Sequence, residues 1–184
     1  MNIRRGLKSA SGSRAGAAFA MGGALAVLFM SGAAVANTYN YTKAKNGYLG
    51  ISNLGMVPNK GAGDYDNSPS SGLSVFAFKC FSRSINLPDG AIIKNLIVYH
   101  RSTEQEAVQA SLLRQTLSDS GRDTVGTRTS TTTTGLRVSF YAPIDPNFAL
   151  VDNARYTYAF NICLNPGSVF YNARLGYSYT SAGD

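Results

Sequence analysis

Few side chains in this sequence are of the types that carry out reactions. It contains one histidine, His100, and two cysteines, Cys80 and Cys163. A cysteine nucleophile needs a neighbouring base, and a zinc site needs three or four nitrogen, sulfur or oxygen ligands at suitable spacing. Neither pattern is present, and no G-x-S-x-G motif marks a serine nucleophile. The sequence therefore predicts no catalytic residue and no resident cofactor, and we expect His100 to have a structural role.

Carboxylates are the other groups that hydrolytic chemistry uses. Asp89, Asp145 and Asp152 all lie in predicted loops, and two of them could act as acid and base if those loops converged. Acidic residues scattered through turns are also what any β protein with an exposed surface carries. A carboxylate-based hydrolase is therefore the last of the functions that we keep open.

One short segment collects oxygen ligands of the kind that calcium prefers. It runs Asp64-Tyr65-Asp66-Asn67, and carboxylate and amide oxygens are typical calcium ligands in secreted modules. The segment lacks the glycine and terminal glutamate of an EF-hand, so a solvated loop is the simpler interpretation. Asp64, Asp66 and Asn67 remain the calcium candidates.

Tyrosine is the aromatic residue that dominates this chain, with eleven tyrosines and no tryptophan. Tyr39, Tyr41, Tyr48 and Tyr65 lie close together in the sequence and could form a platform on which sugar rings stack. Tyrosine in a sheet is more often half-buried packing, which is the alternative interpretation. These four residues are our candidates for sugar stacking.

The beginning of the chain predicts export. Basic residues precede an uncharged run over residues 15–36, which closes on Ala34-Val35-Ala36. This order is typical of a secretory signal peptide, here over residues 1–36 with cleavage between Ala36 and Asn37. The remainder, residues 37–184, has the length of a single domain, and we expect it to be secreted or periplasmic.

Two alternatives stay open for this leader. The uncharged run could remain uncleaved as a membrane anchor, although its many glycines and alanines make it weakly hydrophobic. The pair Arg4-Arg5 also resembles a twin-arginine export signal, without the full pattern around it. No later stretch approaches the roughly 20 apolar residues that a transmembrane helix needs, so we expect none after cleavage.

The positive charge of the chain belongs largely to the leader. Four of the 17 basic residues and none of the ten acidic residues precede residue 37, so 13 basic and ten acidic residues leave a formal +3 on the remainder. Its basic residues are scattered from Lys43 to Arg174, whereas a nucleic-acid-binding protein needs a basic patch or stripe. We therefore do not expect a nucleic acid partner.

The elements that must position these side chains are predicted to be strands. Alternating or continuous apolar residues between Gly, Pro and Asn turns favour strands, and we separate a short-stranded segment at 37–72 from a core at 73–184. The predicted strands cover residues 48–51, 54–57, 73–81, 91–100, 107–117, 124–134, 136–141, 155–164 and 169–180. A helix is the alternative for 107–117, and a flexible loop for the threonine-rich 124–134. The pattern predicts an all-β, antiparallel sandwich, jelly-roll-like rather than immunoglobulin-like.

Both cysteines fall within these strands. In an oxidising compartment, strand cysteines of a small domain favour a disulfide, and we predict the bond Cys80–Cys163. Two separate buried thiols are the alternative, because free cysteine is among the most buried residue types.

Four short motifs follow one another along residues 73–180. They are Leu87-Pro88-Asp89-Gly90-Ala91-Ile92-Ile93, Leu112-Leu113-Arg114, Tyr156-Thr157-Tyr158 and Ala173-Arg174-Leu175-Gly176-Tyr177. In this order they resemble a diffuse group of uncharacterised secreted bacterial proteins with an LP-x-GA-x-I strand opener and a tyrosine-rich C-terminal hairpin. The resemblance implies a β-sandwich at the envelope or outside the cell, and it implies no activity.

The function that these observations favour is non-enzymatic. We expect a secreted β-sandwich that acts by binding or assembly at the bacterial envelope or cell surface, with a protein, a cell-surface glycan or a second copy as partner. Exposed strand edges in the threonine-rich segment and near the N-terminus would serve self-assembly. The alternative is a carbohydrate-binding module that uses exposed tyrosines.

Overall fold

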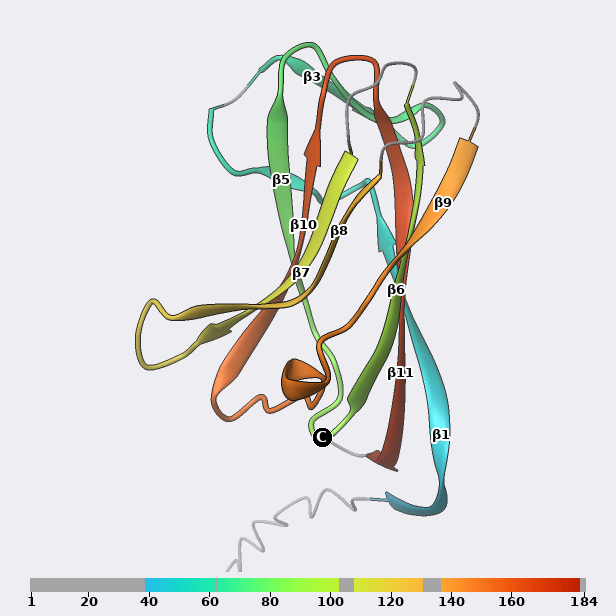
Figure 1. The fold of residues 1–184 in the computed structure, drawn as a ribbon, viewed down its shortest axis with the longest axis vertical. Coiled ribbons are helices and arrows are strands. Elements are labelled where there is room, and N and C mark those ends of the chain that lie inside the picture. The colour runs from blue at the N-terminus through green and yellow to red at the C-terminus, as the bar shows by residue number, and fades with distance from the viewer. Residues whose placement is uncertain (1–38, 62, 103–107, 131–136, 183–184) are drawn as a thin grey trace, which may run out of the picture. The chain divides into compact units, whose positions relative to one another are not determined.

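A computed structural model describes residues 39–61, 63–102, 108–130 and 137–182. These residues form two antiparallel sheets that face each other as a β-sandwich (Figure 1). The predicted leader and its cleavage site at Ala36 and Asn37 lie outside the described residues, as does the threonine run over 131–134. In the described part of the chain, no helix is long and apolar enough to cross a bilayer.

The six-stranded sheet is built around its central strand, β11. Its spatial order is β3 (Tyr65–Ser68), β4 (Gly72–Val75), β11 (Val169–Ala182), β6 (Ile92–Arg101) and β9 (Arg137–Ala142). The long strand β1 (Tyr39–Ser52) pairs with β11 beyond the end of β4. Because β6 occupies the other side of β11, that strand is hydrogen-bonded along both of its edges.

The five-stranded sheet forms the second layer. Its order is β2 (Val57–Pro58), β5 (Lys79–Ile85), β10 (Tyr156–Leu164), β7 (Val108–Thr116) and β8 (Arg122–Ser130). A single turn of 3-10 helix, η1 (Pro146–Phe148), follows β9. The threonine-rich β8 and the N-terminal β1 each lie at a sheet edge, as the sequence predicted.

The connections between the sheets are those of a jelly roll. From β4 onward the chain places β4-β11-β6-β9 in one sheet opposite β5-β10-β7-β8 in the other. This arrangement of two interleaved Greek keys is the jelly-roll topology. The fold class predicted from the sequence is therefore confirmed.

The core lies between the inner faces of the two sheets. Strand β10 turns Tyr158, Phe160 and Ile162 inward, and β11 contributes Phe170 and other buried residues from the opposite sheet. The rings of Phe160 and Phe170 meet across the core with their centroids 5.6 Å apart. Burial of each such side chain contributes about 1.5–3 kcal/mol to folding, so the alternation in these strands holds the layers together.

Three predicted elements differ from the structure. Residues 73–81 were expected to form one strand, but the chain crosses between sheets at Phe76 and Phe78, which are 75% and 62% exposed. The short strand predicted at 48–51 is part of the 14-residue β1, whose polar first half lacks an apolar pattern. Of the strand predicted at 54–57, only Val57 belongs to a strand, the two-residue β2. The helix alternative for 107–117 is wrong, because that segment forms β7.

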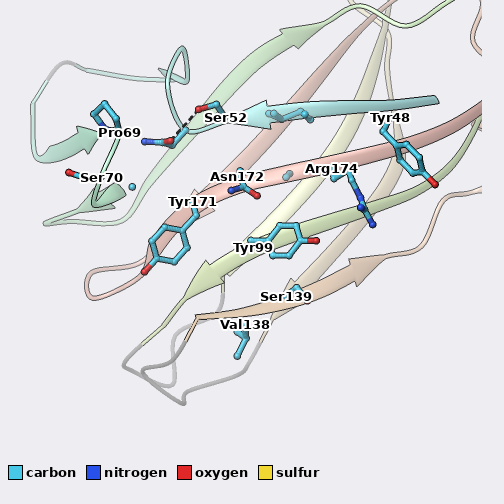
Figure 2. A pocket seen from close by; sticks show the side chains of 15 residues that line it. Tyr48, Ser52, Pro69, Ser70, Tyr99, Val138, Ser139, Tyr171, Asn172 and Arg174 are labelled. Atoms are coloured by element: carbon cyan, nitrogen blue, oxygen red, sulfur yellow. Dashed lines mark hydrogen bonds between the residues drawn. The ribbon is translucent and has the colours of Figure 1, made fainter. Parts of the chain in front are cut away.

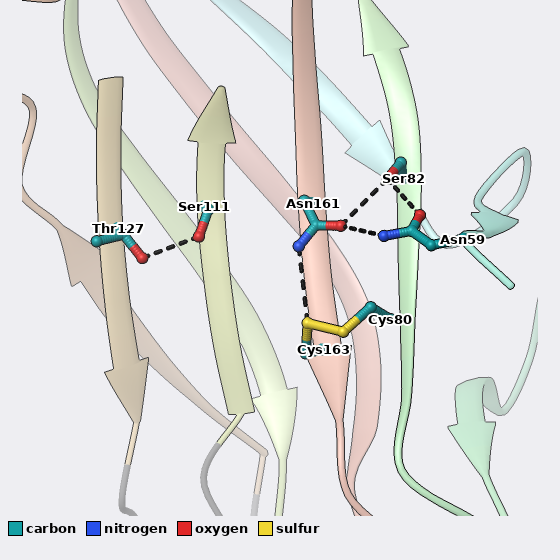
Figure 3. The surroundings of a disulfide bond; sticks show 7 residues. All are labelled: Asn59, Cys80, Ser82, Ser111, Thr127, Asn161 and Cys163. Atoms are coloured by element: carbon teal, nitrogen blue, oxygen red, sulfur yellow. Dashed lines mark hydrogen bonds between the residues drawn. A yellow bond between two sulfur atoms is a disulfide. The ribbon is translucent and has the colours of Figure 1, made fainter. Parts of the chain in front are cut away.

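The predicted disulfide is present. Cys80 in β5 and Cys163 in β10 are direct partners in the antiparallel register, and Figure 3 shows the bond on the outer face of the five-stranded sheet. The cysteines are separated by 83 positions, and closing a loop of that length stabilises the folded chain by about 4.5 kcal/mol in the chain-entropy model. Beside the bond, Asn161 accepts a hydrogen bond of 2.8 Å from the side chain of Asn59.

The one histidine is a core residue. His100 is fully buried on the inner face of β6, and its ring lies edge-on to Phe140 at 5.3 Å between centroids. Neither ring nitrogen has a hydrogen-bond partner among the described residues. Because burial penalises the charged form, the pKa of His100 is lowered from 6.5.

We predict that this histidine makes the fold less stable in mild acid. As the pH falls through 6.5, His100 takes up a proton in the unfolded chain but not in the folded chain. The free energy of unfolding is therefore highest above that pH and decreases as the pH falls. Urea unfolding at pH 7.5 and 5.5 should show a smaller free energy of unfolding at the lower pH, and His100→Leu should reduce that difference. An equal drop in both proteins would contradict the prediction.

Candidate functional site

A groove of about 1140 Å³ lies over the outer face of the six-stranded sheet (Figure 2). Four strands supply most of its lining, and the loop before β4 closes one end. The lining residues are Tyr48, Gly50, Ile51, Ser52, Asn53, Pro69, Ser70, Gly72, Tyr99, Val138, Ser139, Tyr171, Asn172, Ala173 and Arg174. The groove is thus an exposed sheet surface whose side chains are positioned by the pairing of its strands.

The register places the groove's polar side chains in rows across the sheet. Side chains two residues apart on a strand share a face, so directly paired residues form a row over neighbouring strands. One row runs through Ser52, Asn172, Tyr99 and Ser139. The next row begins with Gly50 and Arg174, so hydroxyl, amide, phenol and guanidinium groups lie on one surface.

Tyr48 and Arg174 form a stacked pair at one end of the groove. The guanidinium carbon of Arg174 lies 5.1 Å from the centroid of the Tyr48 ring, and that tyrosine is 63% exposed. Their direct strand partners are glycines, Gly176 opposite Tyr48 and Gly50 opposite Arg174. A Cβ at Gly50 would meet nothing within 4 Å, so the floor beside the pair is open.

Two further tyrosines complete the aromatic lining. Tyr99 lies on β6 in the middle of the sheet, and Figure 2 shows it between Arg174 and Ser139. Tyr171 occupies an irregularity of β11, where the register shifts between Phe170 and Asn172. A bulge of this kind turns two successive side chains toward the same side, so Tyr171 and Asn172 both face the groove.

Asn53 anchors the closed end of the groove. Its amide nitrogen donates to the Asn67 side-chain oxygen at 2.9 Å and to the Ser68 carbonyl at 2.8 Å. The Asn67 amide donates back to the Asn53 carbonyl at 3.1 Å, and the Asn53 backbone N–H donates to the carbonyl of Tyr171 at 3.2 Å. These bonds connect the end of β1 to β3 and to the bulge of β11.

The chemistry of this lining suits binding. Aromatic faces stack on flat apolar surfaces, while serine, asparagine and arginine exchange hydrogen bonds with hydroxyl groups. None of the lining residues that the structure describes is an aspartate, glutamate, histidine or cysteine. The groove therefore offers stacking and hydrogen bonding without an acid and base pair.

The four tyrosines that the sequence put forward do not form one platform in the structure. Tyr48 lines the groove. Tyr41 packs edge-on against Tyr179 at 5.7 Å, and Tyr65 packs edge-on against the buried Phe81 at 5.1 Å. Tyr39 begins β1, and its side chain lies outside the described part of the chain.

The calcium candidates do not gather around one point. Asp66 and Asn67 are consecutive in β3, so their side chains leave opposite faces, and the Asn67 amide is engaged with Asn53. Asp64 precedes the strand in a left-handed conformation, with φ of 62°. Within the described ranges, no three His, Cys, Asp or Glu side chains are grouped as metal ligands.

The three loop carboxylates are engaged in hydrogen bonds or an ion pair with their own or a neighbouring loop. Asp89 accepts a hydrogen bond of 2.7 Å from the backbone of Asn153, which brings it beside the loop of Asp152. Asp145 caps η1. Asp152 is paired with Arg155 at 2.6 Å, and this bond lowers the pKa of Asp152, whereas a general acid needs a raised pKa.

A smaller hollow of about 360 Å³ lies beside the disulfide. It is lined by Asn59, Lys60, Phe78, Lys79 and Cys80. Only one aromatic ring belongs to it, and Lys79 is engaged over the ring of Tyr65. The groove on the six-stranded sheet is therefore the better candidate.

Sequence reasoning missed most of the groove. Tyr99, Tyr171, Asn172 and Arg174 were assigned to strands and given no role. The alternation of Arg174 with buried neighbours did indicate an outward position. It did not indicate which outward residues of distant strands would meet.

Comparison with solved structures finds similar β-sandwiches. No family model and no curated protein sequence matches the chain. The C-terminal carbohydrate-binding module, of family CBM6, of a laminarinase from Zobellia galactanivorans is similar at 17% identity and a TM-score of 0.45, over 70% of this chain and 98% of that one. A xylan-binding module of family CBM15 is similar at 15% identity and a TM-score of 0.47, over 72% of this chain and 97% of that one.

A third similar structure is the family 11 carbohydrate-binding module of a cellulosomal cellulase from Clostridium thermocellum. It is 11% identical with a TM-score of 0.32, over 80% of this chain and 86% of that one. All three TM-scores are below 0.5, so no argument about this chain rests on these likenesses.

We predict that Asn53→Ala lowers the free energy of unfolding by about 1–3 kcal/mol, because it leaves partly buried hydrogen-bonding groups of Asn67 and Ser68 without this partner. Asn53 is only 6% exposed. Asn59→Ala is the matched control, since Asn59 is exposed and its loss should cost less. Urea unfolding of both variants measures the difference, and equal costs would contradict an anchoring role for Asn53.

Proposed function

We propose that this protein is a non-enzymatic carbohydrate-binding protein that holds a glycan chain in the groove of the six-stranded sheet. The observation that carries the proposal is the lining itself, in which Tyr48, Tyr99 and Tyr171 share one surface with Asn172 and Arg174. Sugar rings have apolar faces and hydroxylated edges, and this surface offers a partner for each. The alternative drawn from the sequence is thereby favoured over an unspecified surface protein.

The dimensions of the groove favour a chain of sugars over a single ring. Tyr48 lies on β1, two strands away from Tyr99 on β6, and their rows are separated by four residues of strand. With strands about 4.8 Å apart and about 3.3 Å per residue, the two backbone positions are roughly 16 Å apart. That separation suits a chain of several sugar rings better than a single ring.

The cysteine pair supports a location outside the cytoplasm. Disulfides persist in oxidising compartments, and the bond between Cys80 and Cys163 joins two central segments of the domain. Together with the predicted leader over residues 1–36, this supports export to the periplasm or the cell surface. At that location the protein meets glycans of the cell envelope or of the medium around the cell.

Assembly through strand edges is the second candidate. Strand β8 borders the five-stranded sheet, and outside its bridge between Gly126 and Ile144 its threonine-rich outer edge resembles a template for pairing with another strand. Such pairing would leave the groove open, since the groove lies on the other sheet. Binding and assembly are therefore compatible.

We predict that Tyr48→Ala and Tyr99→Ala each weaken binding to a soluble polysaccharide about two- to twelve-fold, because an aromatic contact contributes about 0.5–1.5 kcal/mol beyond its area. Phe76→Ala is the control, since Phe76 is at least as exposed as Tyr48 and does not line the groove. A glycan array selects the polysaccharide, and affinity electrophoresis measures the change. A folded protein that leaves the array silent contradicts the proposed function.

A further inference from the structure

The groove contains one charged side chain, and it is positive. Arg174 is exposed at the Tyr48 end of the groove, and no carboxylate accompanies it among the described lining residues. Both ion pairs found in the described part of the chain lie elsewhere, at Arg114 with Asp123 and at Arg155 with Asp152. The positive charge of the groove is therefore not neutralised from within.

Arg174 also differs from other strand arginines in what it contacts. Arg83 donates to the carbonyl of Leu54 at 3.0 Å, and Arg128 donates to the carbonyl of Tyr141 at 2.8 Å. Arg114 is paired with a carboxylate and stacks on aromatic rings. By contrast, the contact of Arg174 is with the ring of Tyr48, over which its guanidinium carbon lies, and an arginine that stacks in this way still has N–H donors for a carboxylate or sulfate.

The rest of this sheet has the same sign of charge. Its strands carry six basic residues and one acidic residue, Asp66. The basic residues are Lys43, Lys45, Lys94, Arg101, Arg137 and Arg174. Arg101 follows Tyr99 by two positions on β6 and is exposed, so it shares the outer face with Tyr99. A path along this face thus passes from Arg174 over Tyr99 to Arg101.

We propose that the groove takes an anionic polysaccharide, whose sugar rings lie on Tyr48 and Tyr99 while its carboxylate or sulfate groups meet Arg174 and then Arg101. This inference rests on the proposed function and adds the class of glycan. A guanidinium binds carboxylate or sulfate oxygens through two parallel N–H donors, a geometry that a neutral hydroxyl cannot match. Selection of anionic over neutral chains follows from that difference.

Two matched pairs of polymers test the inference. Polygalacturonate and its fully methyl-esterified form differ in carboxylate charge, and dextran sulfate and dextran differ in sulfate charge. We expect the protein to bind at least one anionic member about five- to thirty-fold more tightly than its neutral counterpart, with weaker binding at higher salt. The pair that shows the preference identifies carboxylate or sulfate as the recognised group.

Substitution of Arg174 tests whether the preference for anionic over neutral polymers arises in the groove. Arg174→Gln keeps a planar amide and removes the charge, and we expect it to reduce the preference about five-fold or more. Arg122→Gln is the matched control, because Arg122 is exposed on the other sheet and removes the same net charge. Circular dichroism confirms that both variants are folded.

The two proposals fail in different ways. Binding of neutral and anionic members with equal affinity, weakened by Tyr48→Ala and unchanged by Arg174→Gln, overturns the anionic inference and keeps the proposed function. Equal effects of Arg174→Gln and Arg122→Gln also overturn the inference, because the preference would then follow net charge. Absence of binding to all four polymers, with a silent glycan array, overturns both.

Discussion

The hydrogen-bonded ladder on both edges of β11 is the constraint on which this structure depends. β6 runs along one edge, while β4 and β1 share the other. On the inner side, Ala173 and Leu175 are buried in the core, which fixes the phase of the strand beyond the bulge at Tyr171. Because side chains alternate, the same phase sends Asn172 and Arg174 to the outer face. The groove is therefore a consequence of how the core is packed.

The fold could be predicted because its signals are local. Alternation from Tyr156 to Leu164 indicated β10, and the two cysteines in predicted strands indicated the bond that the structure contains. The sheet crossing near Phe76 could not be predicted, since an apolar run continues through it and only the tertiary structure decides which side chains are buried. The first half of β1 was missed for the opposite reason, because a polar edge strand has no apolar pattern.

The groove could be predicted only in small part. Tyr48 was a candidate because it is one of four tyrosines proposed as a platform for sugar rings, and it does line the groove. Its partner Arg174 lies more than a hundred residues later, and pairing of β1 with β11 is a non-local contact that the sequence pattern does not specify. Tyr65 illustrates the same limit, because a tyrosine near a strand edge can equally well pack on a core phenylalanine.

Binding of a glycan chain to the outer face of the six-stranded sheet can be followed through backbone amide chemical shifts during titration with an oligogalacturonide. We expect progressive shifts at residues 48–53, 97–101 and 171–174, with little change at Ser82 and Asn161 on the opposite sheet. Shifts confined to the hollow beside the disulfide, around Lys60 and Phe78, would contradict this expectation, because the ligand would then bind the other sheet.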